Sequence, residues 1–192
     1  MIGYAFCGSF CTMQRSIKVL RSLCAEGNRV LPIVSDSVYT TDTRFGTAEE
    51  NVKKIEQICG MPVVHSIVGA EPIGNTLRLD MLVISPCTGN TLAKIAGGIT
   101  DSTVTMAAKA QLRSDRPVVI ALATNDALSA NLENIGVLLK RKNVFFVPLG
   151  QDDPKNKPHS LVCDFDMIPV TMMSAFAGRQ IQPILTSPAL TV

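Results

Sequence analysis

The feature that most constrains the fold is a regular alternation of short apolar segments with longer segments of helical periodicity. The apolar segments predict six strands, at residues 2–7, 29–34, 62–64, 80–84, 117–123 and 144–148. Between them, apolar residues recur every three or four positions, which is typical of helices. Strands that alternate with helices form parallel sheets joined by right-handed crossovers. We therefore expect a single-domain α/β fold, a doubly wound parallel sheet of about six strands with helices on both faces.

Several helical segments carry signals for where they begin and end. The segment 47–59 has Glu49 and Glu50 in its first turn and Gly60 after its last, as helix ends prefer. A later helix is expected over 127–141, with its leucines on one side. In the last helix, which ends at Gly178, apolar residues again recur at helical spacing, and Met172 and Met173 are expected to fill the core. The domain is expected to span residues 1–185, and 186–192 to form an irregular tail.

Composition excludes several classes of protein. The net charge is only +2 and the basic residues are scattered, so the chain lacks the basic patch of a nucleic-acid binder. No apolar stretch approaches the roughly 18 residues that a membrane-spanning helix needs, and the N-terminus does not resemble a secretory signal. Most of the six cysteines lie in apolar periodic segments, which favours reduced thiols in a cytoplasmic compartment. Cysteine and histidine spacing predicts no metal site.

Small and polar residues follow four of the predicted strands directly. Because ligands bind at the carboxyl ends of parallel strands, we expect these segments to line one crevice there. The longest of them reads SPCTGNTLAKIAGGITDS over residues 85–102, and Thr88 or Asn90 is placed to cap the helix that follows. The segments are Gly8-Ser9 after the first strand, the loop with Ser35 and Ser37 after the second, residues 85–102 after the fourth, and Thr124-Asn125-Asp126 after the fifth.

Two nucleotide-binding motifs are absent from the first turn. The pattern GxGxxG does not occur, and the glycine spacing that mimics a Walker A loop lacks its lysine. What remains is a Gly-Ser turn at a helix N-terminus, which suits anions in general. The hydroxyl-rich loop 35–46 beside Arg44 fits either an anion site or a solvated connection, and the residues alone leave both open. His65 has no acid or nucleophile near it in sequence and is expected to be structural or at the surface.

These segments together resemble the FMN-binding flavoprotein family, which includes cysteine decarboxylases and whose central motif reads close to PASANTxAKxAxGxxD. The residues that fall on that motif are Pro86, Thr88, Asn90, Thr91, Ala93, Lys94, Ala96, Gly98 and Asp101. The resemblance implies a Rossmann-like fold and bound FMN. It implies that the phosphate lies near Gly8, Ser9 and Ser35 or Ser37, and the isoalloxazine against Pro86, Thr88, Gly89, Asn90 and Thr91. Cys87 either touches the flavin or is a small buried residue.

The chain also departs from the family pattern. The decarboxylases carry a catalytic histidine before the fourth strand, where this chain reads EPIGNTLRLD with Glu71 and Pro72 near the expected place. Their substrate clamp, close to PxMNxxMW, is reduced here to Thr124-Asn125-Asp126. The resemblance therefore does not favour decarboxylation of a cysteine-like substrate.

Within the family, the blocks TTDTRFG, MAAKAQLR and FVPLGQDDP are most similar to one half of a two-subunit enzyme that makes a pyridine dicarboxylate of bacterial spores. This implies a partner subunit that binds NAD(P), a dehydrogenation with loss of water, a trimer-based homo-oligomer and a mother-cell cytoplasmic location. Candidate residues for a dianionic substrate are Arg44 and Arg113, because guanidinium groups pair with carboxylates. Asn125 and Asp126 are candidates for hydrogen bonding or proton transfer.

Two other classes of function stay open. One is a decarboxylase or prenyl-transfer enzyme of the same fold that acts alone. The other is a non-catalytic regulatory subunit whose flavin site is vestigial.

Overall fold

The strands form one sheet in the computed structural model, which describes residues 1–186. They are β1 (Ile2–Phe6), β2 (Val30–Val34), β3 (Met81–Cys87), β4 (Val118–Thr124), β5 (Val144–Phe146), β6 (Leu149–Gly150) and β7 (Leu161–Cys163). Their order across the sheet is β2-β1-β3-β4-β7-β6, and β5 also pairs with β4. The first five strands pair in parallel, which confirms the predicted α/β class.

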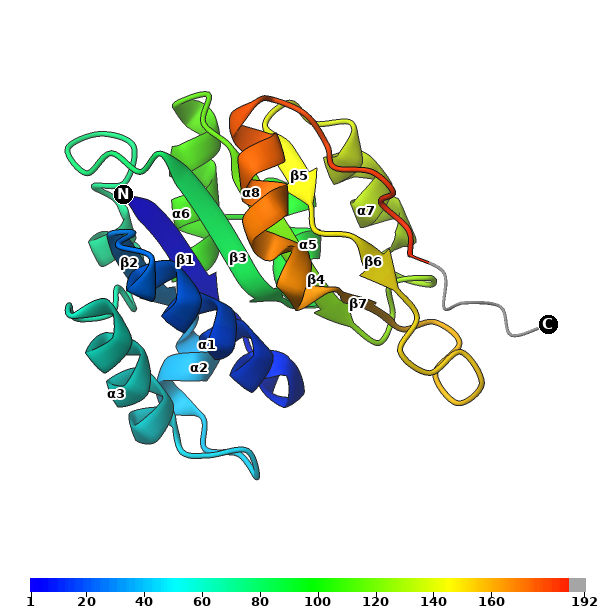
Figure 1. Cartoon of the computed structure of the whole chain (residues 1–192), viewed down its shortest axis with the longest axis horizontal. Coiled ribbons are helices and arrows are strands. Elements are labelled where there is room, and N and C mark those ends of the chain that lie inside the picture. The colour runs from blue at the N-terminus through cyan, green and yellow to red at the C-terminus, as the bar shows by residue number, and fades with distance from the viewer. Residues whose placement is uncertain (187–192) are drawn as a thin grey trace.

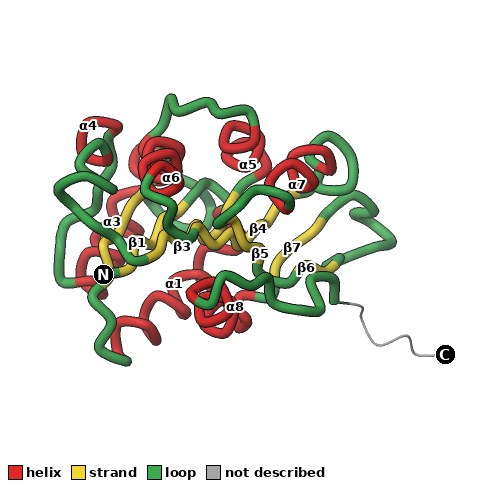
Figure 2. The backbone as a smooth tube through the Cα atoms, turned by 90° about the horizontal axis from the view of Figure 1, so that it is seen from above, coloured by secondary structure: helices red, strands yellow, loops and turns green. Residues whose placement is uncertain are grey.

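Helices cover both faces of this sheet. They are α1 (Phe10–Ala25), α2 (Asp36–Thr40), α3 (Ala48–Cys59), α4 (Ile67–Ala70), α5 (Gly89–Ala96), α6 (Thr103–Arg113), α7 (Leu132–Leu139) and α8 (Ile168–Phe176), with a short 3-10 helix η1 (Phe165–Met167). Figures 1 and 2 show α5, α6 and α7 on one face and α1 and α8 on the other. Every residue of β1 and β3 is buried, as expected for strands covered on both sides.

The predicted ends of α3 are confirmed. Thr47 caps its N-terminus, with the Thr47 hydroxyl accepting from the Glu50 amide at 3.2 Å and the Glu50 carboxylate accepting from the Thr47 amide at 3.0 Å. Gly60 follows with φ 68°, the left-handed conformation that glycine adopts at little cost.

One edge of the sheet differs from the expected parallel arrangement. Strand β7 pairs antiparallel with both β4 and β6, and neither β6 nor β7 was predicted. The segment 62–64, predicted as a strand, contributes only an isolated bridge between Val64 and Ile33. The sixth predicted strand ends early, at Phe146. Strands of two or three residues are too short for a periodic pattern to reveal.

Strand β3 runs further than predicted. It continues through Ser85 and Pro86 to Cys87, and its register against β4 shifts between Ile84 and Cys87. Proline has no amide hydrogen to donate to a neighbouring strand, so an irregular step in the ladder accommodates it. The helix that follows begins directly at the end of this strand.

The helix predicted over 127–141 is shorter in the structure. The backbone carbonyl of Asp126 accepts from the amides of Ser129 and Asn131, which shapes a turn before α7. Within α7 only Ile135 and Leu138 are buried, and Leu132 and Leu139 lie exposed.

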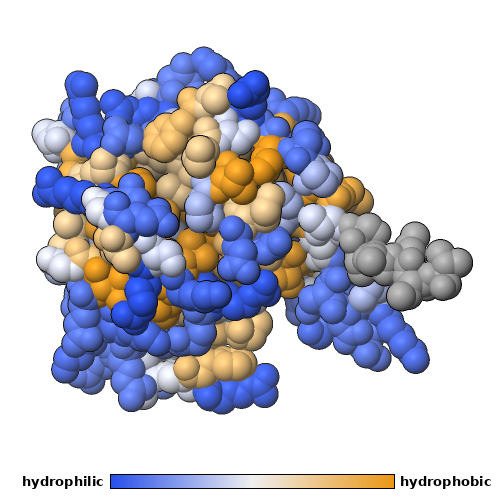
Figure 3. All heavy atoms as spheres, viewed as in Figure 1, coloured by the Kyte–Doolittle hydropathy of each residue, from blue (hydrophilic) through white to orange (hydrophobic). Residues whose placement is uncertain are grey.

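The two methionines of α8 also differ from the prediction. Met172 is buried, whereas the side chain of Met173 is 72% exposed together with Val170 and Phe176. Hydrophobic atoms are visible over α8 in Figure 3. The helix packs on the sheet through Ile168, Met172 and Ala175 instead.

All six cysteines are free thiols, and three of them are buried among apolar side chains. No helix within residues 1–186 has the length and apolar character needed to cross a membrane. Leu185 forms a bridge with Leu149, so the described chain remains in contact with the sheet up to the end of the predicted domain. The tail predicted at 186–192 lies, from residue 187 onward, outside the described residues.

Candidate functional site

A cleft of about 810 Å³ lies beyond the carboxyl ends of the parallel strands. It gathers residues from five separate stretches of the chain, and four of them follow the strands whose polar ends were predicted to meet. The lining residues are Gly8, Ser9, Phe10, Cys11, Thr12, Arg44, Phe45, Thr88, Gly89, Asn90, Ala123, Thr124, Asn125, Asp126, Asp152, Lys157, Ser160 and Val162.

The first wall of the cleft is the N-terminus of α1. Ser9 stands at the cap position, but its hydroxyl accepts from the Thr12 hydroxyl at 3.0 Å and caps no backbone amide, and the first turn contains no acidic residue. The Thr12 amide donates to the Ser9 carbonyl, whereas the amides of Phe10 and Cys11 have no partner within the described chain and are available to an anion. The helix dipole favours negative charge there. Gly8 precedes it in close contact with α2, because a Cβ at Gly8 would lie 2.8 Å from the hydroxyl of Ser37. The hydroxyls of Ser35 and Ser37 contact each other at 3.0 Å.

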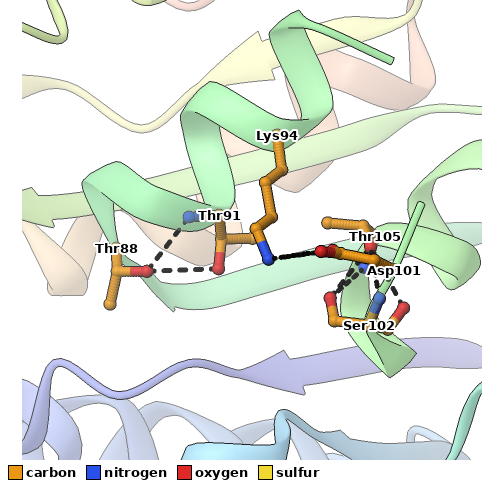
Figure 4. Close-up of polar contacts among 6 residues, drawn as sticks. All are labelled: Thr88, Thr91, Lys94, Asp101, Ser102 and Thr105. Carbon is orange, nitrogen blue, oxygen red and sulfur yellow. Dashed lines mark hydrogen bonds and ion pairs between the residues drawn. The ribbon is translucent and has the colours of Figure 1, made fainter. Parts of the chain in front are cut away.

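The second wall is the N-terminus of α5. Here the hydroxyl of Thr88 accepts from the Thr91 amide at 3.2 Å and donates to the Thr91 hydroxyl at 3.1 Å, so Thr88 is the cap of the two alternatives considered. Gly89 and Asn90 follow it and line the cleft. Figure 4 shows Thr88 and Thr91 at this end of the helix.

The remaining charged residues of the 85–102 stretch serve the fold. The Lys94 ammonium contacts both carboxylate oxygens of Asp101 at 2.9 Å, and Ser102 next to it forms a reciprocal cap with Thr105 (Figure 4). The bond from Lys94 lowers the pKa of the Asp101 carboxyl. Lys94 and Asp101 thus link the last turn of α5 to the residue before the Ser102 cap of α6, and neither lines the cleft.

The third wall is the turn after β4. The carboxylate of Asp126 accepts from the Thr124 hydroxyl at 2.5 Å through one oxygen and from the Asn131 amide group at 2.9 Å through the other. This network touches α5 closely, because a Cβ added to Gly89 would lie 2.5 Å from the Asn131 amide nitrogen. Only a glycine permits this approach. Asn125 lies exposed beside the network, at the cleft surface.

Two loops flank the opening of the cleft. The loop before α3 carries Arg44, whose guanidinium lies 4.9 Å from the centre of the Phe45 ring. The loop between β6 and β7 carries Lys157, which pairs with Asp152 at 2.9 Å. Figure 1 shows both loops projecting from the same edge of the molecule, and Figure 3 shows a hollow between them.

Most of the residues predicted for the site meet here. Gly8, Ser9, Arg44, Thr88, Gly89, Asn90, Asn125 and Asp126 line the cleft. Ser35 and Ser37 lie directly behind Gly8, whereas Pro86 and Thr91 are buried and support the second wall from below.

Arg113 is the exception. It lies exposed in the last turn of α6, at the amino ends of the strands, and does not line the cleft. Arg116, three residues further on, donates to the carbonyl of Leu79. Leu79 lies just before β3, so this part of the chain is at the amino ends of the strands. The structure therefore separates Arg113 from the other candidates.

Residues of the cleft that the sequence patterns did not indicate include Phe10, Cys11, Asp152, Lys157 and Ser160. The last three come from the loop that returns to β7, and only Asp152 lies within the FVPLGQDDP block. A loop without periodicity gives no indication of which of its side chains turn toward a cleft.

Cys87 is fully buried and does not line the cleft, which agrees with the interpretation as a small buried residue. A hydrogen bond with Cys7 and burial raise the pKa of the Cys87 thiol, so it stays protonated. His65 is exposed, and its ring stacks on Tyr39 with centroids 4.0 Å apart, outside the cleft lining. Glu71 and Pro72 do not reach the cleft either.

Comparison with known families now adds to this geometry. The sequence model of the flavoprotein family matches residues 1–176. The chain belongs to the flavoprotein family. The matched residues include all three walls of the cleft and the loop that carries Lys157.

Two individual relatives extend over nearly the whole flavoprotein chain. The B subunit of dipicolinate synthase from Bacillus subtilis (strain 168) is 48% identical over 184 residues, which cover 96% of this chain and 92% of that protein. The crystal structure of the corresponding B subunit from Bacillus halodurans has a TM-score of 0.89 at 45% identity and covers 97% of this chain and 95% of that one.

A more distant flavoprotein structure shares the fold alone. AnUbiX, solved in complex with FMN and dimethylallyl pyrophosphate, has a TM-score of 0.60 at 20% identity and covers 77% of this chain and 76% of that one.

The cleft of this flavoprotein fits FMN by its own geometry. The uncapped first turn of α1, which contains no acidic residue, suits the phosphate. Its volume of about 810 Å³ lies within the range of roughly 300–1,000 Å³ that is typical of small-molecule sites. The cleft therefore offers a place for the phosphate and enough volume for a ligand of this kind.

Proposed function

We propose that this chain acts as the B subunit of a dipicolinate synthase. In this proposal it works with an A subunit that binds NAD(P), and the pair converts a dihydrodipicolinate or hydroxy-tetrahydrodipicolinate precursor to dipicolinate during sporulation. The single observation that carries the proposal is 48% identity over 96% of the chain to the dipicolinate synthase protein of Bacillus subtilis. The six free cysteines favour a reducing compartment, which we take to be the mother-cell cytoplasm.

We further propose that the cleft holds FMN. The phosphate would be held by Gly8, Ser9 and the first-turn amides of α1, with Ser35 and Ser37 behind them. The ring would lie against Thr88, Gly89 and Asn90. Bound there, FMN supplies hydride acceptance or relay. The family match and the uncapped α1 N-terminus support this assignment.

The chain's own residues would handle the substrate. Arg44 offers a cation to a substrate carboxylate at the cleft opening. Asn125 makes no side-chain hydrogen bond within the described chain and is free to donate to or accept from a ring substituent. Both oxygens of Asp126 already accept hydrogen bonds, so its main contribution would be to hold the turn that presents Asn125.

An assembly of several copies belongs to the same proposal. The solved flavoproteins of this fold include a dodecamer and a cubic cage, at 20% identity each. The exposed apolar side chains on α7 and α8 are available for contacts between copies or with the A subunit. We propose a trimer-based homo-oligomer that also binds the A subunit.

The proposal is tested by reconstituting dipicolinate formation from purified proteins. We expect no dipicolinate from this chain alone and formation when NAD(P) is added together with the A subunit. If the A subunit with NAD(P) forms dipicolinate at the full rate when this chain is left out, the result would instead support the regulatory alternative. Turnover of a substrate by this chain without the A subunit would support the stand-alone decarboxylase or prenyl-transfer alternative.

A further inference from the structure

We propose that Lys157 and Arg44 form a two-point anion site, in which each binds one carboxylate of a flat dianionic substrate and Asp152 holds Lys157 while the site is empty. This inference rests on the proposed function, because it assigns the substrate class to the same cleft. It adds a specificity-determining residue, Lys157, that takes the place expected for Arg113.

The two cations come from opposite ends of the sheet. Arg44 follows β2 at one edge, and Lys157 lies between β6 and β7 at the other. Both nevertheless line the same cleft. The proposal places one carboxylate of the substrate on each of these two cations.

The loop that carries Lys157 is held by its own hydrogen bonds. The amide of Lys157 donates to the Asp153 carbonyl at 2.7 Å, and the amide of Ser160 donates to the Lys157 carbonyl at 3.0 Å. The loop is also fastened to the turn after β4, because the Leu128 amide donates to the His159 carbonyl at 2.9 Å. A backbone held in this way positions the lysine side chain beside the cleft.

The charged side chains around the cleft are two cations and two acids, and both acids already have partners. The charged side chains that line it are Arg44, Lys157, Asp126 and Asp152. The oxygens of Asp126 accept from Thr124 and Asn131, and Asp152 is paired with Lys157. The pairing with Asp152 raises the pKa of Lys157, which keeps the ammonium charged. The parts of the first and second walls formed by Gly8, Ser9, Thr88 and Gly89 carry no charged side chain.

Asp152 can release Lys157 at little cost. The Lys157 side chain is 54% exposed, and an ion pair in such surroundings contributes little to stability because water screens it. A substrate carboxylate can therefore replace Asp152 as the partner of Lys157. Asp152 would compete with the substrate for this lysine.

The test uses the full chain loaded with FMN and measures binding of two probes, pyridine-2,6-dicarboxylate and pyridine-2-carboxylate, by calorimetry. Lys157→Met should weaken dicarboxylate binding by about two- to fivefold, the effect of losing one ion pair that water screens, and leave monocarboxylate binding unchanged. Asp152→Asn should strengthen dicarboxylate binding. Lys155→Met, on the same loop but outside the cleft lining, is the matched control and should change neither.

The outcomes separate this inference from the proposed function. If Lys157→Met keeps the full preference for the dicarboxylate, the two-point site is wrong while the function stands. If Asp152→Asn weakens binding as much as Lys157→Met does, Lys157 merely supports the loop and the inference is again wrong. If the unmodified protein shows no preference for the dicarboxylate, both the site and the proposed substrate class fail.

Discussion

Gly89→Ala is expected to remove most FMN binding and to lower the free energy of unfolding by about 1–3 kcal/mol, the usual cost of overpacking a close contact. The added Cβ would lie 2.5 Å from the Asn131 amide nitrogen, 2.6 Å from the Thr124 hydroxyl and 2.8 Å from an Asp126 oxygen. Those atoms hold one another by hydrogen bonds, so none moves freely. The start of α5 must move instead, and it forms a wall of the cleft.

The matched control for this substitution is Gly136→Ala. Gly136 lies in α7 with no atom within 4 Å of an added Cβ, and alanine is the better helix former. The control should keep its FMN and be unchanged or more stable by about 0.4–1 kcal/mol. Urea unfolding and FMN retained after gel filtration measure both effects. A Gly89→Ala protein as stable and as yellow as the unmodified protein would contradict the close contact.

Asp126→Ala is expected to lower the free energy of unfolding by about 2–4 kcal/mol, because two donors lose their acceptor and each unpaired donor costs about 1–3 kcal/mol. The donors are the Thr124 hydroxyl and the Asn131 side-chain amide, and Asn131 is buried. The turn after β4 should loosen, and Asn125 with it. Asp166→Ala, at an exposed acid on η1, is the control and should change stability by less than about 0.5 kcal/mol.

Urea unfolding of the Gly89→Ala/Asp126→Ala double variant shows whether the two substitutions act on one network. With Asp126 removed, part of the obstacle to a Cβ at position 89 disappears. The loss in the double variant should therefore be smaller than the sum of the two single losses, by about 0.5–3 kcal/mol. Additive losses would mean that Gly89 and Asp126 stabilise separate parts of the fold, which the distances between them do not allow.

The sequence predicted the walls of the cleft well because they lie at strand ends. Parallel strands bring their carboxyl ends to one edge, so Gly8, Thr88 and Asn125 had to meet once the strands were recognised. Arg113 was predicted to join this site but lies away from the cleft, for a related reason. It is the last residue of α6, which returns the chain to the amino end of β4, and a helix end that precedes a strand lies at the opposite edge of the sheet from the cleft.

The loops and outer helices were harder to predict. Lys157 reaches the cleft because β7 returns antiparallel, and three-residue strands leave no pattern in a sequence. The prediction that Met173 fills the core was wrong for another reason. Met172 and Met173 are the same residue type and neighbours in the chain. Which of the two is buried depends on the helix face that packs on the sheet through Ile168 and Ala175.

The most direct test of the central claim is a spectrophotometric titration of the purified full chain with FMN. If the cleft is a flavin site, the flavin absorption band should shift as FMN binds, saturate at one FMN per chain and remain with the protein after gel filtration. A colourless protein whose addition leaves the flavin spectrum unchanged would contradict the flavin site.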